Sequence, residues 1–125
     1  MDKALLDAFA ARAAQKAEAR LEIKTFHVGE LALECRRLSQ ADTLRYYEAF
    51  SEADKASMLL ESCTALIYDS CPALQEPELH RTLGVTDPID TVRRLLDVRE
   101  IDMLGGELAR WQGLAAPLAE DTAKN

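Results

Sequence analysis

Proline and glycine divide the second half of this chain into short segments. The breaks fall at Cys71-Pro72, Glu76-Pro77, Gly84, Asp87-Pro88 and Gly105-Gly106. Proline cannot continue a helix that arrives from its N-terminal side, and glycine commonly ends one. Residues 62–114 are therefore predicted to form four short helical pieces, which indicates a compact helical module.

Several of these pieces have identifiable ends. Residues 78–83 form a short helical turn that Gly84 closes. Asp87 and Pro88 match the N-cap and first position of the next helix. The buried side of that helix is expected to hold Val92, Leu95 and Leu96.

The last helix carries an apolar stripe. The spacings of three, four and three residues place Ile101, Leu104, Leu108 and Trp111 on one face. This stripe passes through Gly105-Gly106, and two glycines inside a helix cost roughly 1–2 kcal/mol against alanine. The helix is therefore expected either to kink there or to receive another backbone at close range.

The first 20 residues differ in composition from the rest of the chain. Residues 3–20 are rich in alanine, and Leu6, Phe9, Ala13 and Ala17 share one helical face. Alanine buries little area, so the sequence predicts a helix that is peripheral or depends on a partner.

Residues 21–37 change to an alternating pattern that predicts a β-hairpin. The first strand alternates Leu21, Ile23 and Thr25 with charged residues, and the second alternates Leu31, Leu33 and Cys35 with Ala32, Glu34 and Arg36. The turn between them is expected at Val28-Gly29-Glu30. A helix over residues 31–38 is the alternative for the second strand.

Two further helices are expected between the hairpin and Pro72. The first begins at Ser39, three residues before Asp42, and its apolar side is expected to hold Leu44, Tyr47 and Phe50, with Tyr46 flanking them. The second is long, and its buried side is expected to hold Leu59, Cys63, Leu66, Ile67 and Ser70. The predicted fold is therefore mainly α, a small single-domain bundle of about five helices with an N-terminal β-hairpin over residues 21–37.

Composition limits the possible partners. At 125 residues the chain can bury a core without disulfides or metal. Residues 1–50 carry eight basic and eight acidic side chains, whereas residues 51–125 carry seven and fourteen, which gives the net charge of −7. That sign disfavours a nucleic acid as partner. No apolar run approaches the roughly 20 residues needed to span a bilayer, and no signal peptide follows Met1, so a membrane partner is not expected.

Candidate catalytic chemistry is sparse. Cys35, Cys63 and Cys71 fit buried thiols in a reducing cytosol, and neither His27 nor His80 has a metal-ligand spacing with any of them. A Cys–His nucleophile pair could be assembled from these residues, but no local signature supports one. We therefore expect no enzyme activity, no catalytic residue, no cofactor and no metal.

The ordered motifs of the second half resemble a known family. They are a helix with Leu66-Ile67-Tyr68-Asp69-Ser70-Cys71-Pro72, then Gly84-Val85-Thr86-Asp87-Pro88, Val92-x-x-Leu95-Leu96, Glu100-Ile101 and a closing Gly113-Leu114. This order is similar to that of the XkdN-like phage tail assembly chaperones, over roughly residues 21–114. The resemblance covers a chaperone-like domain (21–114) and leaves the N-terminal helix (1–20) and the tail (115–125) outside it. The tail lacks an apolar face and is expected to be flexible.

The resemblance implies a non-catalytic chaperone of a phage or prophage. Such a protein would bind the tape measure protein and tail tube subunits in the cytoplasm of the bacterial host, and would be absent from the mature virion. It offers no catalytic residues, since the matched prolines and glycines are structural. The alternative is a helical adaptor or regulatory protein-binding module unrelated to phage tails, and a homo-oligomer is compatible with either.

Two groups of apolar residues are candidate partner contacts. The first is the stripe Ile101, Leu104, Leu108 and Trp111, and the second is Leu5, Leu6 and Phe9 in the first helix. A helical stripe can equally be core, and the sequence leaves that alternative open.

Overall fold

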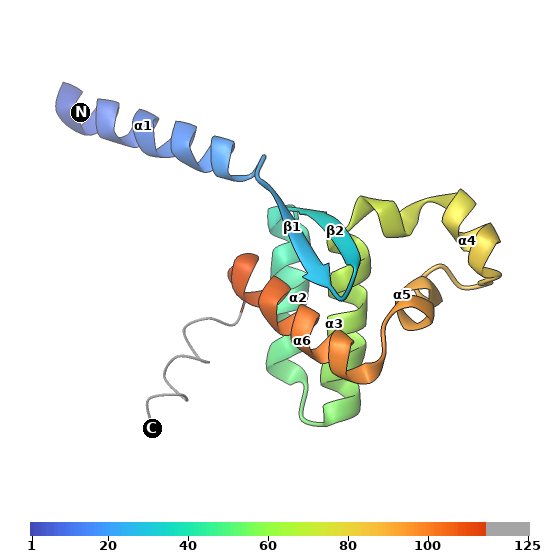
Figure 1. Cartoon of the computed structure of the whole chain (residues 1–125). Coiled ribbons are helices and arrows are strands. Elements are labelled where there is room, and N and C mark those ends of the chain that lie inside the picture. The colour runs from blue at the N-terminus through green and yellow to red at the C-terminus, as the bar shows by residue number, and fades with distance from the viewer. Residues whose placement is uncertain (115–125) are drawn as a thin grey trace.

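The computed structural model describes residues 1–114 of the chain, and it is mainly helical with one two-stranded hairpin (Figure 1). The expected flexible tail, residues 115–125, lies outside the described residues. In chain order the elements are α1 (Lys3–Ala19), β1 (Ile23–Val28), β2 (Leu31–Arg36), α2 (Gln40–Glu52), α3 (Ala56–Ser70), a 3₁₀ helix (Pro72–Gln75), α4 (Pro77–Leu83), α5 (Asp90–Leu95) and α6 (Val98–Trp111). The predicted mainly α fold with a hairpin is confirmed, with six α-helices in the described part instead of about five.

The hairpin forms where the alternation predicted it. Its two strands are antiparallel, with Val28 opposite Leu31 and a two-residue turn in which Gly29 adopts a φ of 59°. This register places Phe26 opposite Leu33, and both are buried, whereas Ile23 is exposed. The apolar face expected for the first strand, Leu21, Ile23 and Thr25, therefore points outward, because the turn sets the register and a shift of one residue exchanges the faces.

Helix α2 begins at the expected place but faces the core with a different tyrosine. The hydroxyl of Ser39 accepts a hydrogen bond from the Asp42 amide at 3.1 Å, which caps the helix. Tyr46 is the buried side chain, while Leu44 and Tyr47 are exposed. The buried face of α2 is therefore rotated by about one residue from the face that the sequence predicted.

Helix α3 is the centre of the fold, and it packs against α6, α2 and α5 (Figure 1). It ends at Ser70, directly before Cys71-Pro72, as the proline predicted. Its buried residues are Cys63, Thr64, Leu66, Ile67 and Ser70. Leu59, which was expected in this set, is instead 41% exposed near the start of the helix.

The short elements between α3 and α6 follow the proline and glycine pattern with one shift. Gly84 ends α4 with a φ of 67°, as predicted. Helix α5 begins at Asp90, not at Asp87-Pro88. Asp87 instead starts a tight turn, in which its carboxylate accepts from the Ile89 amide at 3.3 Å and its carbonyl accepts from the Asp90 amide at 2.9 Å. The predicted start signal thus begins a turn that leads into the helix.

Helix α6 runs without interruption through Gly105-Gly106 and crosses α3 at short range. A β-carbon placed on Gly105 would lie 2.5 Å from the Cys63 Cβ. Of the two alternatives for the glycine pair, close approach of another backbone is therefore the one observed. The start of α6 is fixed by a capping box between Asp97 and Glu100, with hydrogen bonds of 2.9 and 3.1 Å.

The C-terminal end of α6 is tied to the segment between the hairpin and α2. The side-chain amide of Gln112 donates to the Arg36 carbonyl at 2.9 Å and accepts from the Leu38 amide at 3.2 Å. Arg37 donates to the Trp111 carbonyl, and its guanidinium lies 4.0 Å from the centroid of the Trp111 ring. These contacts join residues more than 70 positions apart and close the body of the domain.

Candidate protein-binding surface

The apolar stripe of α6 lies inside the fold. Ile101, Leu104 and Leu108 are all less than 4% exposed and belong to one core cluster with residues of α3 and the hairpin. The open alternative is thus decided in favour of core. This corrects the expectation that these three residues contact a partner, because no surface of theirs is available in the folded domain.

Trp111, the fourth member of that stripe, is half-buried at the end of α6. Its ring meets Phe26 edge to face with centroids 5.8 Å apart, and the Arg37 guanidinium lies over the same ring. Arg37 also forms a 3.0 Å ion pair with Glu22. The aromatic ring is therefore engaged within the domain, and it anchors α6 against the hairpin.

The second expected group remains at the surface. Leu5, Leu6 and Phe9 are 46%, 55% and 56% exposed, and among the described residues α1 contributes no buried side chain. The helix extends away from the body of the domain, with its N-terminus at the far end (Figure 1). Its last turn approaches the body, where Lys16, Ala19 and Arg20 line a shallow pocket with residues of α2. The structure therefore keeps these three apolar side chains available to a partner.

A groove between the N-terminal turns of α3 and α6 was not expected from the sequence. Its volume is about 640 Å³, and its lining residues are Ala56, Ser57, Leu59, Leu60, Val98, Arg99 and Asp102. Val98 is 65% exposed at the first position of α6. The available signal was that Val98 precedes Ile101 by three residues, so the first turn of α6 carries an apolar side chain beyond the core stripe. We call these seven residues the α3–α6 groove.

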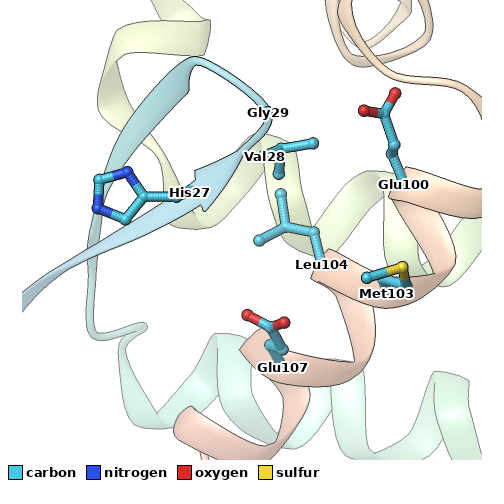
Figure 2. Close-up of a pocket in the computed structure, with 7 residues that line it drawn as sticks. All are labelled: His27, Val28, Gly29, Glu100, Met103, Leu104 and Glu107. Atoms are coloured by element: carbon cyan, nitrogen blue, oxygen red, sulfur yellow. The ribbon is translucent and has the colours of Figure 1, made fainter.

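A second hollow lies between the hairpin turn and α6 (Figure 2). It measures about 170 Å³, below the several hundred that ligand pockets generally occupy. His27, Glu100 and Glu107 line it, but in Figure 2 the imidazole and the two carboxylates point in different directions. This arrangement does not bring a base and an acid together on one substrate.

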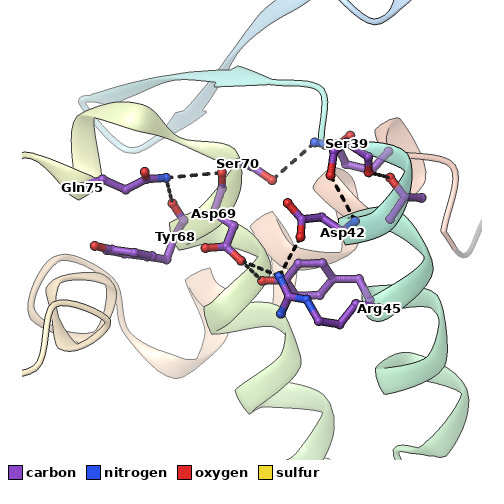
Figure 3. Close-up of polar contacts among 10 residues, drawn as sticks. Ser39, Asp42, Arg45, Tyr68, Asp69, Ser70 and Gln75 are labelled. Carbon is purple, nitrogen blue, oxygen red and sulfur yellow. Dashed lines mark hydrogen bonds and ion pairs between the residues drawn. The ribbon is translucent and has the colours of Figure 1, made fainter.

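A polar cluster joins α2 to α3 (Figure 3). The hydroxyl of Tyr46 donates to Asp69, and Arg45 bridges Asp69 and Asp42 at 3.4 and 3.2 Å. Burial and the bond to Asp69 raise the pKa of Tyr46 above its ordinary value. The tyrosine is thus held in its neutral, hydrogen-donating form, which suits a structural link better than proton abstraction.

The cysteines and histidines do not form the Cys–His pairs that the sequence left open. The Cys35 thiol donates to the Leu33 carbonyl at 3.7 Å. Its interaction with the neighbouring Cys71 thiol in the core raises the pKa of Cys35 and lowers that of Cys71. His80 instead lies 2.7 Å from the Leu74 carbonyl and stacks on Tyr68. Cys63 packs against Gly105, as described above.

Within residues 1–114, no cluster of three or more His, Cys, Asp or Glu side chains is arranged to hold a metal ion. In the same part of the chain, no helix has both the length and the apolar character needed to cross a membrane. No family model matches the chain, and no curated protein or solved structure is significantly similar to it. The surface of the domain itself is therefore the basis for a function.

Proposed function

We propose that this protein is a non-catalytic chaperone that binds a helical segment of a client protein in the α3–α6 groove. The observation that carries the proposal is the groove itself, with Leu59 and Val98 exposed on its walls. An amphipathic helix that lays apolar anchors into a groove of this kind is a recurring mode of peptide recognition. The client is the tape measure protein of a phage or prophage tail, with the tail tube subunit as a second client, in the cytoplasm of the bacterial host.

Two features support this kind of client. Tape measure proteins are long helical chains whose apolar stripes self-associate, and covering such a stripe keeps the chain soluble. The chaperone's net charge of −7, all of it contributed by residues 51–125, favours a client helix with basic flanks and keeps the complex in solution. The ordered motifs that resemble the tail assembly chaperones lie in the same half of the chain.

The groove also suits reversible binding. It is open, and the side chains that line it include no large aromatic anchor. Interfaces that lack such an anchor are generally weaker than those built around one. A client held in this way can be released when the tail tube polymerises, and the chaperone would then be absent from the mature virion.

The test is co-expression with the tape measure or tail tube protein encoded beside the gene, followed by co-purification. Val98→Asp and Leu59→Asp should abolish the complex while the domain stays folded, because both side chains are exposed. Leu44→Asp is the matched control, since Leu44 is 60% exposed on α2 and does not line the groove. No complex with either client would contradict the proposal, and equal loss in the control would place the contact elsewhere.

A further inference from the structure

Helix α1 lacks the tertiary contacts that normally stabilise a helix. It has 17 residues, so it is about 25 Å long, and it extends from the body with no buried side chain among the described residues (Figure 1). Isolated helices of this length are marginal in water even when they are rich in alanine. The Asp2 cap, which accepts from the Ala4 amide at 3.2 Å, adds only a modest contribution. A partner that covers α1 would therefore stabilise it.

The sizes of the side chains along α1 indicate how that partner runs. The large apolar residues, Leu5, Leu6 and Phe9, all lie in its first half, and Ala13 and Ala17 continue the same face in the second half. Two parallel copies would place large residues against large ones at one end and alanine against alanine at the other, which would splay the helices. Two antiparallel copies instead place Leu6 and Phe9 over alanines, at nearly constant separation.

The charges favour the same orientation. With the two helices crossing near residue 11, Asp2 lies beside Arg20 of the second copy, and both residues belong to the helical face of Leu6, Phe9 and Ala13. The same register sets Leu6 over Ala17 and Phe9 over Ala13. A parallel pair in register would instead place like charges opposite each other, which is unfavourable. Both size and charge thus make α1 complementary to an antiparallel copy of itself.

We propose that α1 is a self-association arm, which pairs antiparallel with α1 of a second copy of this chain to form a two-fold symmetric dimer. A two-fold contact uses the same patch on both subunits, as this complementarity requires. One pair of alanine-rich helices buries less than the roughly 1,600 Å² of a standard stable interface. The dimer is therefore concentration-dependent and exchanges its subunits.

The dimer would give the proposed chaperone two grooves. Because α1 extends from the body, two paired arms carry two separate α3–α6 grooves, one on each subunit. Two weak grooves on one particle bind a client with repeated apolar segments more tightly than either alone. The pairing of α1 does not depend on the proposed function, and the two are tested with different variants.

Sedimentation velocity over a range of concentrations tests the dimer on the full-length chain. The wild type should shift from monomer to dimer, and Phe9→Asp should weaken the dimer on the order of a hundredfold, because both copies lose the side chain. Leu21→Asp, at a residue 79% exposed outside α1, is the matched control and should leave the dimer unchanged. A wild type that stays monomeric throughout, or a dimer that survives Phe9→Asp, would overturn the inference.

A charge exchange tests the orientation. Asp2→Lys and Arg20→Glu should each weaken the dimer, since each sets like charges side by side, and the double variant should restore most of it. In a parallel pair the double variant would restore nothing. Val98→Asp provides the remaining comparison, because loss of the dimer in this variant would mean that the arm of one copy docks in the groove of the other, which contradicts self-pairing of α1. Client binding by a variant that cannot dimerise would separate this failure from failure of the chaperone proposal.

Cross-linking tests directly how the two α1 helices are oriented in the dimer. A protein with Leu6→Cys should form an intermolecular disulfide with a protein carrying Ala17→Cys, on mixing under mild oxidation. Each protein alone should cross-link poorly, because an antiparallel pair holds the two copies of residue 6 at opposite ends. The native thiols are buried and should contribute little background. Preferential cross-linking of residue 6 to residue 6 would overturn the antiparallel arrangement.

Discussion

Gly105 of helix α6 packs directly against Cys63 of helix α3. A β-carbon on Gly105 would lie 2.5 Å from both the Cβ and the Sγ of Cys63, and 3.3 Å from its Cα. The Cβ is fixed to the α3 backbone, so rotation of the cysteine side chain cannot relieve the clash. The separation of the two main helices therefore depends on the missing side chain at residue 105.

Gly105→Ala is expected to destabilise the domain by up to about 2 kcal/mol net. Overpacking a core costs about 1–3 kcal/mol, and the higher helix propensity of alanine returns about 1 kcal/mol of that. Gly106→Ala is the matched control, since the nearest atom to its added β-carbon is an Arg110 Nη1 at 3.8 Å. This control should stabilise the domain by about 0.5–1 kcal/mol. Urea unfolding at neutral pH measures both, and equal effects at the two positions would contradict the close approach.

Gln112→Ala should lower the free energy of unfolding by about 1–3 kcal/mol. The substitution leaves the Arg36 carbonyl and the Leu38 amide without their partner in a partly buried site. Gln112→Glu should cost a similar amount, because a carboxylate can accept from the Leu38 amide but cannot donate to the Arg36 carbonyl. Gln40→Ala, at an exposed position, serves as control and should change stability by less than about 0.5 kcal/mol in the same unfolding experiment.

Asp97→Ala should destabilise the domain by about 1 kcal/mol, because it removes the cap of α6. The carboxylate of Asp97 accepts a hydrogen bond from the Glu100 amide at 2.9 Å. Among the described residues, no other side chain accepts from this amide. Asp90→Ala is a suitable comparison, since Asp90 lies in the first turn of α5 and makes an exposed 2.9 Å ion pair with Arg93. Thermal unfolding should show a clearly larger drop in Tm for Asp97→Ala, and the reverse order would argue against the cap.

The sequence predicted those parts of the fold that depend on local backbone chemistry. Ser39 caps a helix, Gly29 turns the hairpin, and Gly84 ends a helix, because each requirement lies within a few residues. Which face of each helix or strand is buried was predicted less well. Phe26 is buried in place of Ile23, since the register of the hairpin is set by the turn and by packing against α6.

The candidate interface shows the same limit. An apolar stripe at helical spacing has the same sequence pattern whether it contacts a partner or packs in the core. The sequence therefore could not decide whether Ile101, Leu104 and Leu108 belong to an interface or to the core. The groove residues Leu59 and Val98 lie 39 positions apart in the sequence and share no local motif. Their proximity follows from the packing of α3 on α6, which no local pattern specifies.

The buried Tyr46 predicts a loss of stability at alkaline pH. Burial and the hydrogen bond to Asp69 raise its pKa above the ordinary value near 10, so the folded state holds a proton that the unfolded state releases first. The stabilising contribution is complete below pH 10 and declines as the pH rises past it. Unfolding free energies measured between pH 8 and about pH 11 should therefore fall less steeply for Tyr46→Phe than for the wild type.

The neighbouring tyrosine supplies the control for this experiment. Tyr47→Phe, at a residue 51% exposed on the same helix, should retain the wild-type slope. Some alkaline loss should remain in Tyr46→Phe as well, because burial raises the pKa of Cys63 to about 11 from its ordinary 9.0 and gives a contribution of the same sign. An identical slope for the wild type and Tyr46→Phe would show that Tyr46 titrates equally in the folded and unfolded states, and would contradict the buried bond to Asp69.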